Sequence, residues 1–326
     1  MNAKTLKLTC FVAALPLLLT LSKTTHAQGW VSSRISTGGS DLNTVYFLDS
    51  KRGWVGGDNG YLSHTEDGGG TWERQAVGTK APINDIYFRD KEAGFLLAGN
   101  SIFVTRDGAS WIQSRIFLPE EFGGADVELY SVRFSSKKKG WVVGSISKRQ
   151  RVIDSILVYT DDEGKSWRRQ RAPSSRELIH IDFVSDKRGW IVGDSGTILY
   201  TRDAGASWTK QNVNATGTLY HVDFRNDKDG WAVGERGLML RTTNGGETWT
   251  TISTNTDETL LSVQFVNDDE GWAIGRSGTI LRSSDEGKTW IQQESTTKQN
   301  LYSLNFNKKI GWVVGGEGLL LRYERG

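Results

Sequence analysis

Tryptophan recurs at equivalent positions of one repeating pattern, and this regularity constrains the fold more than any other feature of the chain. Trp30 lies alone near the start, directly after a glycine. Six of the 13 tryptophans follow glycine in a Gly-Trp pair, and Phe95 stands in at one further copy: Trp54, Trp141, Trp190, Trp231, Trp272 and Trp312. Six others close a loop that contains Asp or Asn: Trp72, Trp111, Trp167, Trp208, Trp249 and Trp290.

The glycines of the Gly-Trp and Gly-Phe pairs lie 40 to 49 residues apart and mark seven copies of the pattern. A fixed period of about 40 residues is typical of propellers and solenoids. Each copy contains four short alternating segments, such as Leu129 to Phe134, bounded by Gly, Asp, Asn and Ser. The sequence therefore predicts seven blades of four short strands each.

The two ends of the chain predict how the ring closes. The last copy supplies only three strands, at Leu301 to Phe306, Gly311 to Gly315 and Leu319 to Tyr323. The segment from Trp30 to Thr37 matches the missing fourth strand, and its pairing there would leave no bare sheet edge. We therefore predict an all-β fold, one seven-bladed β-propeller over residues 28–326.

Residues 1–27 are expected to form a signal peptide. Two lysines precede an apolar run from Phe11 to Leu21, and Thr25-His26-Ala27 offers a cleavage site. We expect export to the periplasm or the extracellular space, or to the thylakoid lumen in a phototroph. Lipid attachment at Cys10 is the less favoured alternative, because this cysteine lies before the apolar run.

Removal of residues 1–27 changes the formal net charge from +2 to −1 and removes the only cysteine. The remaining chain has no global attraction to nucleic acid or anionic membranes, and no thiol for disulfides or metal. We expect a monomer that is at most peripheral to membranes, with a protein partner, no nucleic-acid partner, no cofactor and no metal.

The loops that close on tryptophan follow the pattern Ser/Thr-x-Asp-x-Gly-x-Ser/Thr-Trp, with one contracted copy from Thr105 to Trp111. The Asp or Asn side chain is expected to accept turn N–H groups, while glycine adopts a positive φ. Six near-identical loops around a ring cannot each be an active site, so we interpret them as structural. Their Asp or Asn positions are Asp67, Asp107, Asp162, Asp203, Asn244 and Asp285.

This loop resembles the Asp-box, or bacterial neuraminidase, repeat that sialidases carry. For a sialidase the resemblance implies an arginine triad, an Arg-Ile-Pro segment and a Tyr/Glu nucleophile pair on six blades. None of the four prolines follows Arg-Ile here, and seven copies are present. An Asp-box glycoside hydrolase or a carbohydrate-binding propeller is therefore the alternative function.

Over all seven copies the consensus resembles the photosystem II stability/assembly factor family. The consensus Val-x-Phe-x6-Gly-Trp-x-Val-Gly-x-x-Gly-x-Ile-Leu-x-Thr-x-Asp-x-Gly-x-Thr-Trp is best seen at Val222 to Trp249 and Ile181 to Trp208. The resemblance implies an exported, non-enzymatic assembly factor. Such a factor holds a precursor or partner protein, such as a membrane-complex subunit, on an arginine-rich propeller surface.

Two departures from the period indicate where a partner binds, because binding surfaces of repeat proteins are built where repeats differ. From Trp111 to Val132 the chain takes 21 residues where five other copies take 14, which places an insertion within Ile112 to Glu128. In the third copy, an eight-residue extension lies within Ser145 to Ser155. Because strand directions alternate, both insertions should lie side by side on the face opposite the Asp loops.

Basic residues on or near that face are the candidate partner-binding residues, and they suit an acidic peptide or protein. The extension and the second-to-third loops carry Lys148, Arg149, Arg151, Arg236 and Arg276. A second group occupies one equivalent position at the end of the third strand, toward the other face: Arg241, Arg282 and Arg322. The alternative for each arginine is that it is solvated or stacks on a neighbouring tryptophan ring.

Histidine offers one weaker lead. His180-x-Asp182 and His221-x-Asp223 occupy equivalent first-strand positions in adjacent blades, near the central channel. Such pairs could ligate a metal or act in acid–base chemistry, but a buried hydrogen-bond network is the favoured interpretation. His64 has no partner in the sequence pattern.

Overall fold

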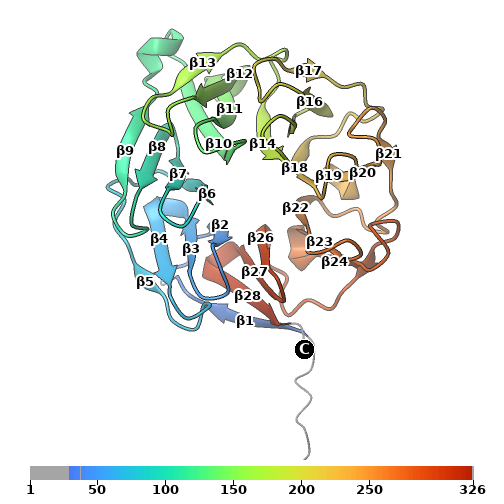
Figure 1. Cartoon of the computed structure of the whole chain (residues 1–326). Coiled ribbons are helices and arrows are strands. Elements are labelled where there is room, and N and C mark those ends of the chain that lie inside the picture. Colours follow the sequence, from blue (N-terminus) through green and yellow to red (C-terminus); the bar gives the residue numbers. More distant parts are fainter. Residues whose placement is uncertain (1–28, 37, 325–326) are drawn as a thin grey trace, which may run out of the picture.

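The computed structural model describes residues 29–36 and 38–324, so the expected signal peptide lies outside the described residues. Seven antiparallel four-stranded sheets are arranged as a closed ring around a central channel (Figure 1). The predicted seven-bladed β-propeller is therefore confirmed.

In blades 1 to 6 the four strands follow one another outward from the channel in chain order. Blades 1 to 3 consist of β2 (Leu42–Phe47), β3 (Gly53–Gly57), β4 (Tyr61–Thr65) and β5 (Glu73–Arg74); β6 (Ile83–Phe88), β7 (Gly94–Ala98), β8 (Ser101–Thr105) and β9 (Ile112–Ile116); and β10 (Asp126–Phe134), β11 (Gly140–Lys148), β12 (Arg151–Thr160) and β13 (Arg168–Gln170).

The later blades repeat the same order, and their outer strands have two residues each, as in blade 1. Blades 4 to 6 consist of β14 (Leu178–Phe183), β15 (Gly189–Gly193), β16 (Thr197–Thr201) and β17 (Thr209–Lys210); β18 (Leu219–Phe224), β19 (Gly230–Gly234), β20 (Met239–Thr242) and β21 (Thr250–Thr251); and β22 (Leu260–Phe265), β23 (Gly271–Gly275), β24 (Ile280–Ser283) and β25 (Ile291–Gln292). Short 3-10 turns are η1 (Asp58–Gly60), η2 (Pro119–Phe122), η3 (Glu235–Gly237), η4 (Arg276–Gly278) and η5 (Gly316–Gly318).

Blade 7 closes the ring as the sequence predicts. It contains β26 (Leu301–Asn307), β27 (Ile310–Gly315) and β28 (Leu319–Glu324), with β1 (Trp30–Arg34) antiparallel to β28 (Figure 1). Trp30 is 6% exposed and packs edge-on against Trp272 of blade 6 at 5.4 Å between ring centroids. The first described strand therefore contributes both a backbone ladder and a large apolar contact to the last blade.

The Gly-Trp pairs are explained by the packing between neighbouring blades. Trp190 of blade 4 stacks on Phe224, on the inner strand of blade 5, with ring centroids 3.4 Å apart. Phe224 in turn covers Gly230 of its own blade, where an added Cβ would lie only 2.4 Å from the ring. Glycine allows the aromatic ring to approach the backbone, and tryptophan then reaches the next blade.

Candidate partner-binding surface

The Asp loops have the structural geometry that the sequence predicts. In blade 6, the Asp285 carboxylate accepts hydrogen bonds from the Ser283 hydroxyl (2.8 Å) and from the backbone N–H groups of Lys288 (3.1 Å) and Thr289 (2.9 Å). Desolvation acts to raise the pKa of Asp285, but the hydrogen bonds from Thr289 and Ser283 outweigh it and lower this pKa to about 2. The carboxylate therefore stays ionised at neutral pH, and its hydrogen bonds fix the conformation of the turn.

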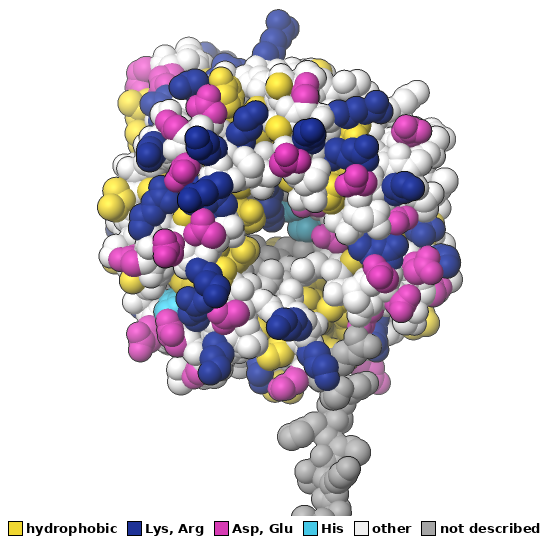
Figure 2. All heavy atoms as spheres, in the orientation of Figure 1, with side chains coloured by type: hydrophobic (Ala, Val, Ile, Leu, Met, Phe, Trp, Pro, Cys, Tyr) yellow, Lys and Arg dark blue, Asp and Glu magenta, His cyan; other side chains and the backbone are white. Residues whose placement is uncertain are grey.

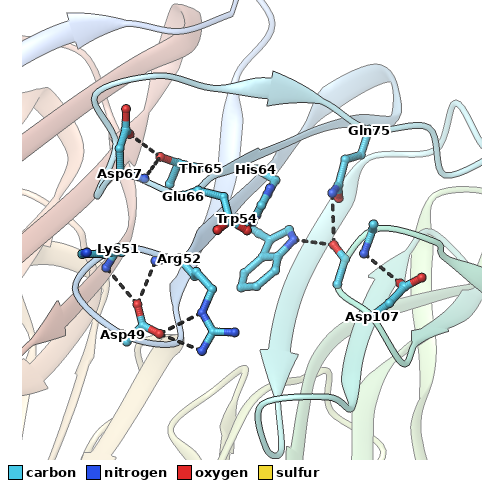
Figure 3. A network of polar contacts seen from close by, with 12 residues as sticks. Asp49, Lys51, Arg52, Trp54, His64, Thr65, Glu66, Asp67, Gln75 and Asp107 are labelled. Atoms are coloured by element: carbon cyan, nitrogen blue, oxygen red, sulfur yellow. Dashed lines mark hydrogen bonds and ion pairs between the residues drawn. The ribbon is translucent and has the colours of Figure 1, made fainter.

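The Asp loops also connect neighbouring blades. Trp54 of blade 1 donates its indole N–H to the Gly108 carbonyl in the Asp107 loop of blade 2 at 2.9 Å, and Gln75 donates to the same oxygen (Figure 3). Trp312 and the blade 1 loop repeat this bond, with Gly68 as acceptor at 3.0 Å. Because these loops contribute bonds to the ring itself, the geometry supports their structural interpretation.

Figure 3 also shows a partner for His64 that the repeat pattern did not indicate. The imidazole Nε2 lies 3.3 Å from a Glu66 carboxylate oxygen, and the ring packs on Trp54 with centroids 4.8 Å apart. This histidine therefore belongs to the packing of blade 1.

The two insertions meet at blade 3, on the face opposite the Asp loops. The first insertion forms the end of β9, the turn η2 and the start of β10, and the second lengthens the β11–β12 hairpin. The Lys148 ammonium, near the hairpin tip, donates a hydrogen bond to the carbonyl of Gly123, just after η2, at 3.0 Å. Arg149 and Gln150 form the tip, both with positive φ.

The other arginine candidates divide into two groups. Arg236 in η3 and Arg276 in η4 are exposed in second-to-third loops, on the same face as the insertions. The remaining three are half-buried. Of these, Arg241 lies over the Trp231 ring at 5.7 Å and Arg282 over Trp272 at 5.2 Å.

Ion pairs further engage the second group. Arg282 contacts the buried Glu270 carboxylate at 2.7 Å, whereas the Arg322 guanidinium lies 3.5 Å from exposed Glu324. Arg241 and Arg282 therefore stack on tryptophan rings, which is the alternative to partner binding that the sequence analysis gave for each arginine. The three arginines do not form one surface with Arg236 and Arg276.

Sequence reasoning missed several groups beside the blade 3 hairpin. Arg169 and Arg171 are exposed on and just after β13, and Val152 and Ile153 are 39% and 51% exposed on β12. The basic run Arg168-Arg-Gln-Arg171 directly after the loop tryptophan was the signal that could have indicated the arginines. The exposure of the two apolar residues depends on the hairpin geometry and had no sequence signal.

The central channel contains a cavity of about 240 Å³ at the inner strands, and Figure 2 shows the central opening on one face. His180 and His221 stack in its wall with ring centroids 3.7 Å apart. Arg133 of blade 3 lies 3.1 Å from His180 Nε2 and donates to Asp85 of blade 2 at 2.7 Å. Burial lowers the pKa of His221 to about 3, and burial also holds the pKa of His180 well below its ordinary value, so both rings are neutral.

The carboxyl groups of Asp182 and Asp223 connect neighbouring blades. Asp182 accepts the backbone N–H of Phe224 in the next blade at 2.9 Å, and Asp223 accepts that of Phe265 at 2.8 Å. Burial, then the neighbouring Asp182 carboxyl, raises the pKa of Asp223 to about 8. The predicted His-Asp positions therefore lie on the inner strands of adjacent blades. His180, Asp182 and Asp223 each accept a backbone N–H of the next blade and Arg133 contacts His180, whereas His221 Nδ1 has no hydrogen-bond partner among the described residues.

Two possible features are absent from the part of the chain that the structure describes. Within residues 29–36 and 38–324, no helix has the length and apolar character to cross a membrane. The same residues contain no group of three or more His, Cys, Asp or Glu side chains that could hold a metal ion.

A closed ring of seven blades, with Asp or Asn loops between the third and fourth strands of blades 1 to 6, defines the protein as an Asp-box β-propeller of the seven-bladed class. The family model described as Photosynthesis system II assembly factor YCF48 matches residues 71–174, 167–257 and 253–324. These matches span most of the chain, and the chain belongs to this family. No curated protein sequence matches the chain.

Solved structures with similar folds include two of the same family. A structure described as YCF48 bound to D1 peptide is 21% identical, with 91% of this chain and 95% of that chain covered and a TM-score of 0.72. YCF48 from Cyanidioschyzon merolae is 19% identical, with 90% and 98% covered and a TM-score of 0.69. An inactive virginiamycin B lyase from Staphylococcus aureus with Quinupristin is 13% identical, with 91% and 99% covered and a TM-score of 0.75, and shares the fold alone.

Proposed function

We propose that this protein is a non-enzymatic assembly factor that holds an acidic segment of a protein partner on the face carrying the two insertions. The partner is a membrane-complex subunit or its precursor. The observation that carries this proposal is the junction of both insertions at Lys148 and Gly123, in a chain of the assembly-factor family. The complex of a family member with a D1 peptide supports a polypeptide ligand.

The location and assembly state extend this proposal. The apolar leader would export the chain to the periplasm, the extracellular space or, in a phototroph, the thylakoid lumen, where it acts as a monomer. A non-enzymatic role is supported by the carboxylates themselves. The Asp285 loop carboxylate binds its own turn, and Asp182 and Asp223 bind backbone N–H groups of the next blade.

The proposal is tested by capture from a membrane extract of the source organism. Charge reversal to Glu of Lys148, Arg149 and Arg151 together, or of Arg236 and Arg276 together, should abolish capture of a membrane-complex subunit. Both sets should unfold within about 0.5 kcal/mol of wild type, because they are exposed.

The matched control reverses Lys137 to Lys139, which are exposed in the β10–β11 loop on the Asp-loop face. This variant should retain capture. Loss of capture in the control alone would place the partner on the Asp-loop face. Turnover of sialosides or aryl glycosides by the purified protein would refute the non-enzymatic role.

A further inference from the structure

The third blade carries a strand edge that no other strand covers. β12 pairs with β11 from Arg151 to Thr160, with a bulge at Ile153, which has no partner residue on β11. On its other side, β12 pairs with β13 only at residues 157–159. Among the residues that the structure describes, the outer edge of residues 151–156 thus has no partner strand.

This edge is long and partly apolar. β12 has ten residues, whereas the third strands of the other six blades have four to six. Val152 and Ile153, both β-branched, are 39% and 51% exposed on the free part. Soluble proteins protect such edges by shortening or covering them, because unpaired N–H and C=O groups pair readily with another chain. The edge is therefore a template for an added strand.

A groove follows the same edge. A cavity of about 400 Å³ lies between Asp154 and Ser155 of β12 and residues 169–175. The Ser155 hydroxyl donates to the Ser174 carbonyl at 2.7 Å and closes the inner end of the groove. The volume is within the range of about 300–1,000 Å³ for ligand pockets, which suits a few residues of extended chain.

The charges around the groove favour an acidic occupant. Asp154 is the only carboxylate among the residues that line the cavity, and Arg169 contacts it at 3.1 Å. Arg171 lies exposed in the wall, and Arg151 and Arg149 are exposed at the hairpin tip. Three exposed acids, Glu120, Glu121 and Asp126, belong to the neighbouring insertion, and Glu121 is paired with Arg115. Complementary charge steers association and selects the partner.

The first insertion does not fill the groove. Phe122 of η2 packs against the core cluster that includes Ile156 and Val158 of β12, which lies on the face of the sheet. Arg169 stacks over the Phe122 ring at 5.3 Å. The first insertion thus supports the hairpin from its face and fixes Arg169, while the edge stays open.

We propose that the outer edge of β12 binds an extended, acidic segment of the partner protein by strand addition. The segment pairs its backbone with residues 151–155, places apolar side chains against Val152 and Ile153, and directs carboxylates toward Arg171. This inference rests on the proposed function for the existence of a protein partner, and it adds where and how that partner binds. Backbone bonds supply affinity in this mode, and alternate side chains supply specificity.

The test uses a short synthetic peptide of alternating glutamate and valine, together with the same peptide N-methylated at alternate residues. The two peptides share charge and side chains, but the methylated peptide cannot pair as a strand. Fluorescence anisotropy should show binding of the first peptide and at least about tenfold weaker binding of the second, a difference of about 1.4 kcal/mol. Hydrogen exchange should show protection by the first peptide at residues 151–155.

Variants separate the edge from general charge. Val152→Ser with Ile153→Ser should weaken binding of the first peptide, while Ile291→Ser, which removes an even more exposed apolar residue on β25, should leave binding unchanged. Replacement of residues 145–155 by the blade 4 turn Asp194–Gly196 removes the edge at a length that the fold already uses and should abolish binding.

Three outcomes of the peptide experiments would overturn strand addition. These are no binding of the unmodified peptide, equal binding of both peptides, and protection at η3 and η4 instead of β12. If the shortened hairpin still captured the membrane-complex subunit, strand addition would be wrong while the proposed function stood. Loss of subunit capture in the Arg236 and Arg276 variant but not in the shortened hairpin would likewise rule out strand addition at β12.

Discussion

Replacement of Asp223 by asparagine should stabilise the protein and remove part of its pH dependence. Asp223 lies in the channel wall beside Asp182, and burial followed by the Asp182 carboxyl raises its pKa from 3.8 to about 8. A carboxyl with a raised folded-state pKa retains a proton that the unfolded chain has lost. Stability from this group is therefore present below about pH 4 and is lost as the pH rises toward 8.

The magnitude follows from the size of the pKa difference. One pKa unit corresponds to about 1.4 kcal/mol, so even half of the four-unit difference would cost the folded protein about 3 kcal/mol by pH 8. Asparagine carries no charge and keeps an oxygen for the Phe265 N–H. Blade 7 already uses this solution, because Asn305 accepts the backbone N–H of Phe47 at 3.0 Å.

Urea unfolding followed by tryptophan fluorescence between pH 5 and 9 measures this effect. Asp223→Asn should be the more stable protein at pH 8 and should show a flatter pH profile, while Asp182 keeps its electrostatic interaction with Arg133. The reverse change, Asn305→Asp, should create a new loss of stability as the pH rises. Identical pH slopes for wild type and Asp223→Asn would refute the reasoning.

Three further changes test the ring itself by the same unfolding assay. Asp285→Ala should lower the free energy of unfolding by about 1–3 kcal/mol through lost turn hydrogen bonds. Asp285→Asn should lower it little, because Asn244 accepts the equivalent backbone bond in blade 5 at 3.0 Å. Equal losses for the two variants would contradict the turn role. Deletion of Trp30–Arg34 should open blade 7 and cause aggregation, and an unchanged unfolding midpoint would show that closure does not need β1. Gly230→Ala should cost about 1–3 kcal/mol by overpacking against the inner-strand phenylalanine, and a neutral result would contradict the close approach.

The fold could be predicted from the sequence because its packing constraint repeats seven times. Each Gly-Trp pair combines an aromatic that reaches the next blade with a glycine over which its own blade's phenylalanine packs, as at Gly230 and Phe224. The pair therefore recurs at the same position in each repeat of the sequence. The closing strand at Trp30 was predictable for the same reason, because the single strand at the start of the chain completes the last repeat, which supplies only three strands.

The candidate site was only partly predictable, because its contacts join residues of different blades that share no sequence pattern. His180 and Asp182 stood out as a repeated pair, but Arg133, which contacts His180, comes from the preceding blade and is 47 residues away. The insertions were placed correctly by counting. The groove beside β12 was not, because it depends on where pairing with β13 stops.

The loops on the two faces of the propeller contribute differently to the contacts between blades. On the Asp-loop face, loop carbonyls such as those of Gly108 and Gly68 accept tryptophan N–H groups from the adjoining blade, and this bond is made even by the contracted loop that contains Gly108. The hairpin of blade 3 could grow on the opposite face, because its extra residues extend beyond the contacts between blades. The growth of this hairpin therefore leaves the closed ring intact, and the exposed edge of residues 151–156 belongs to it.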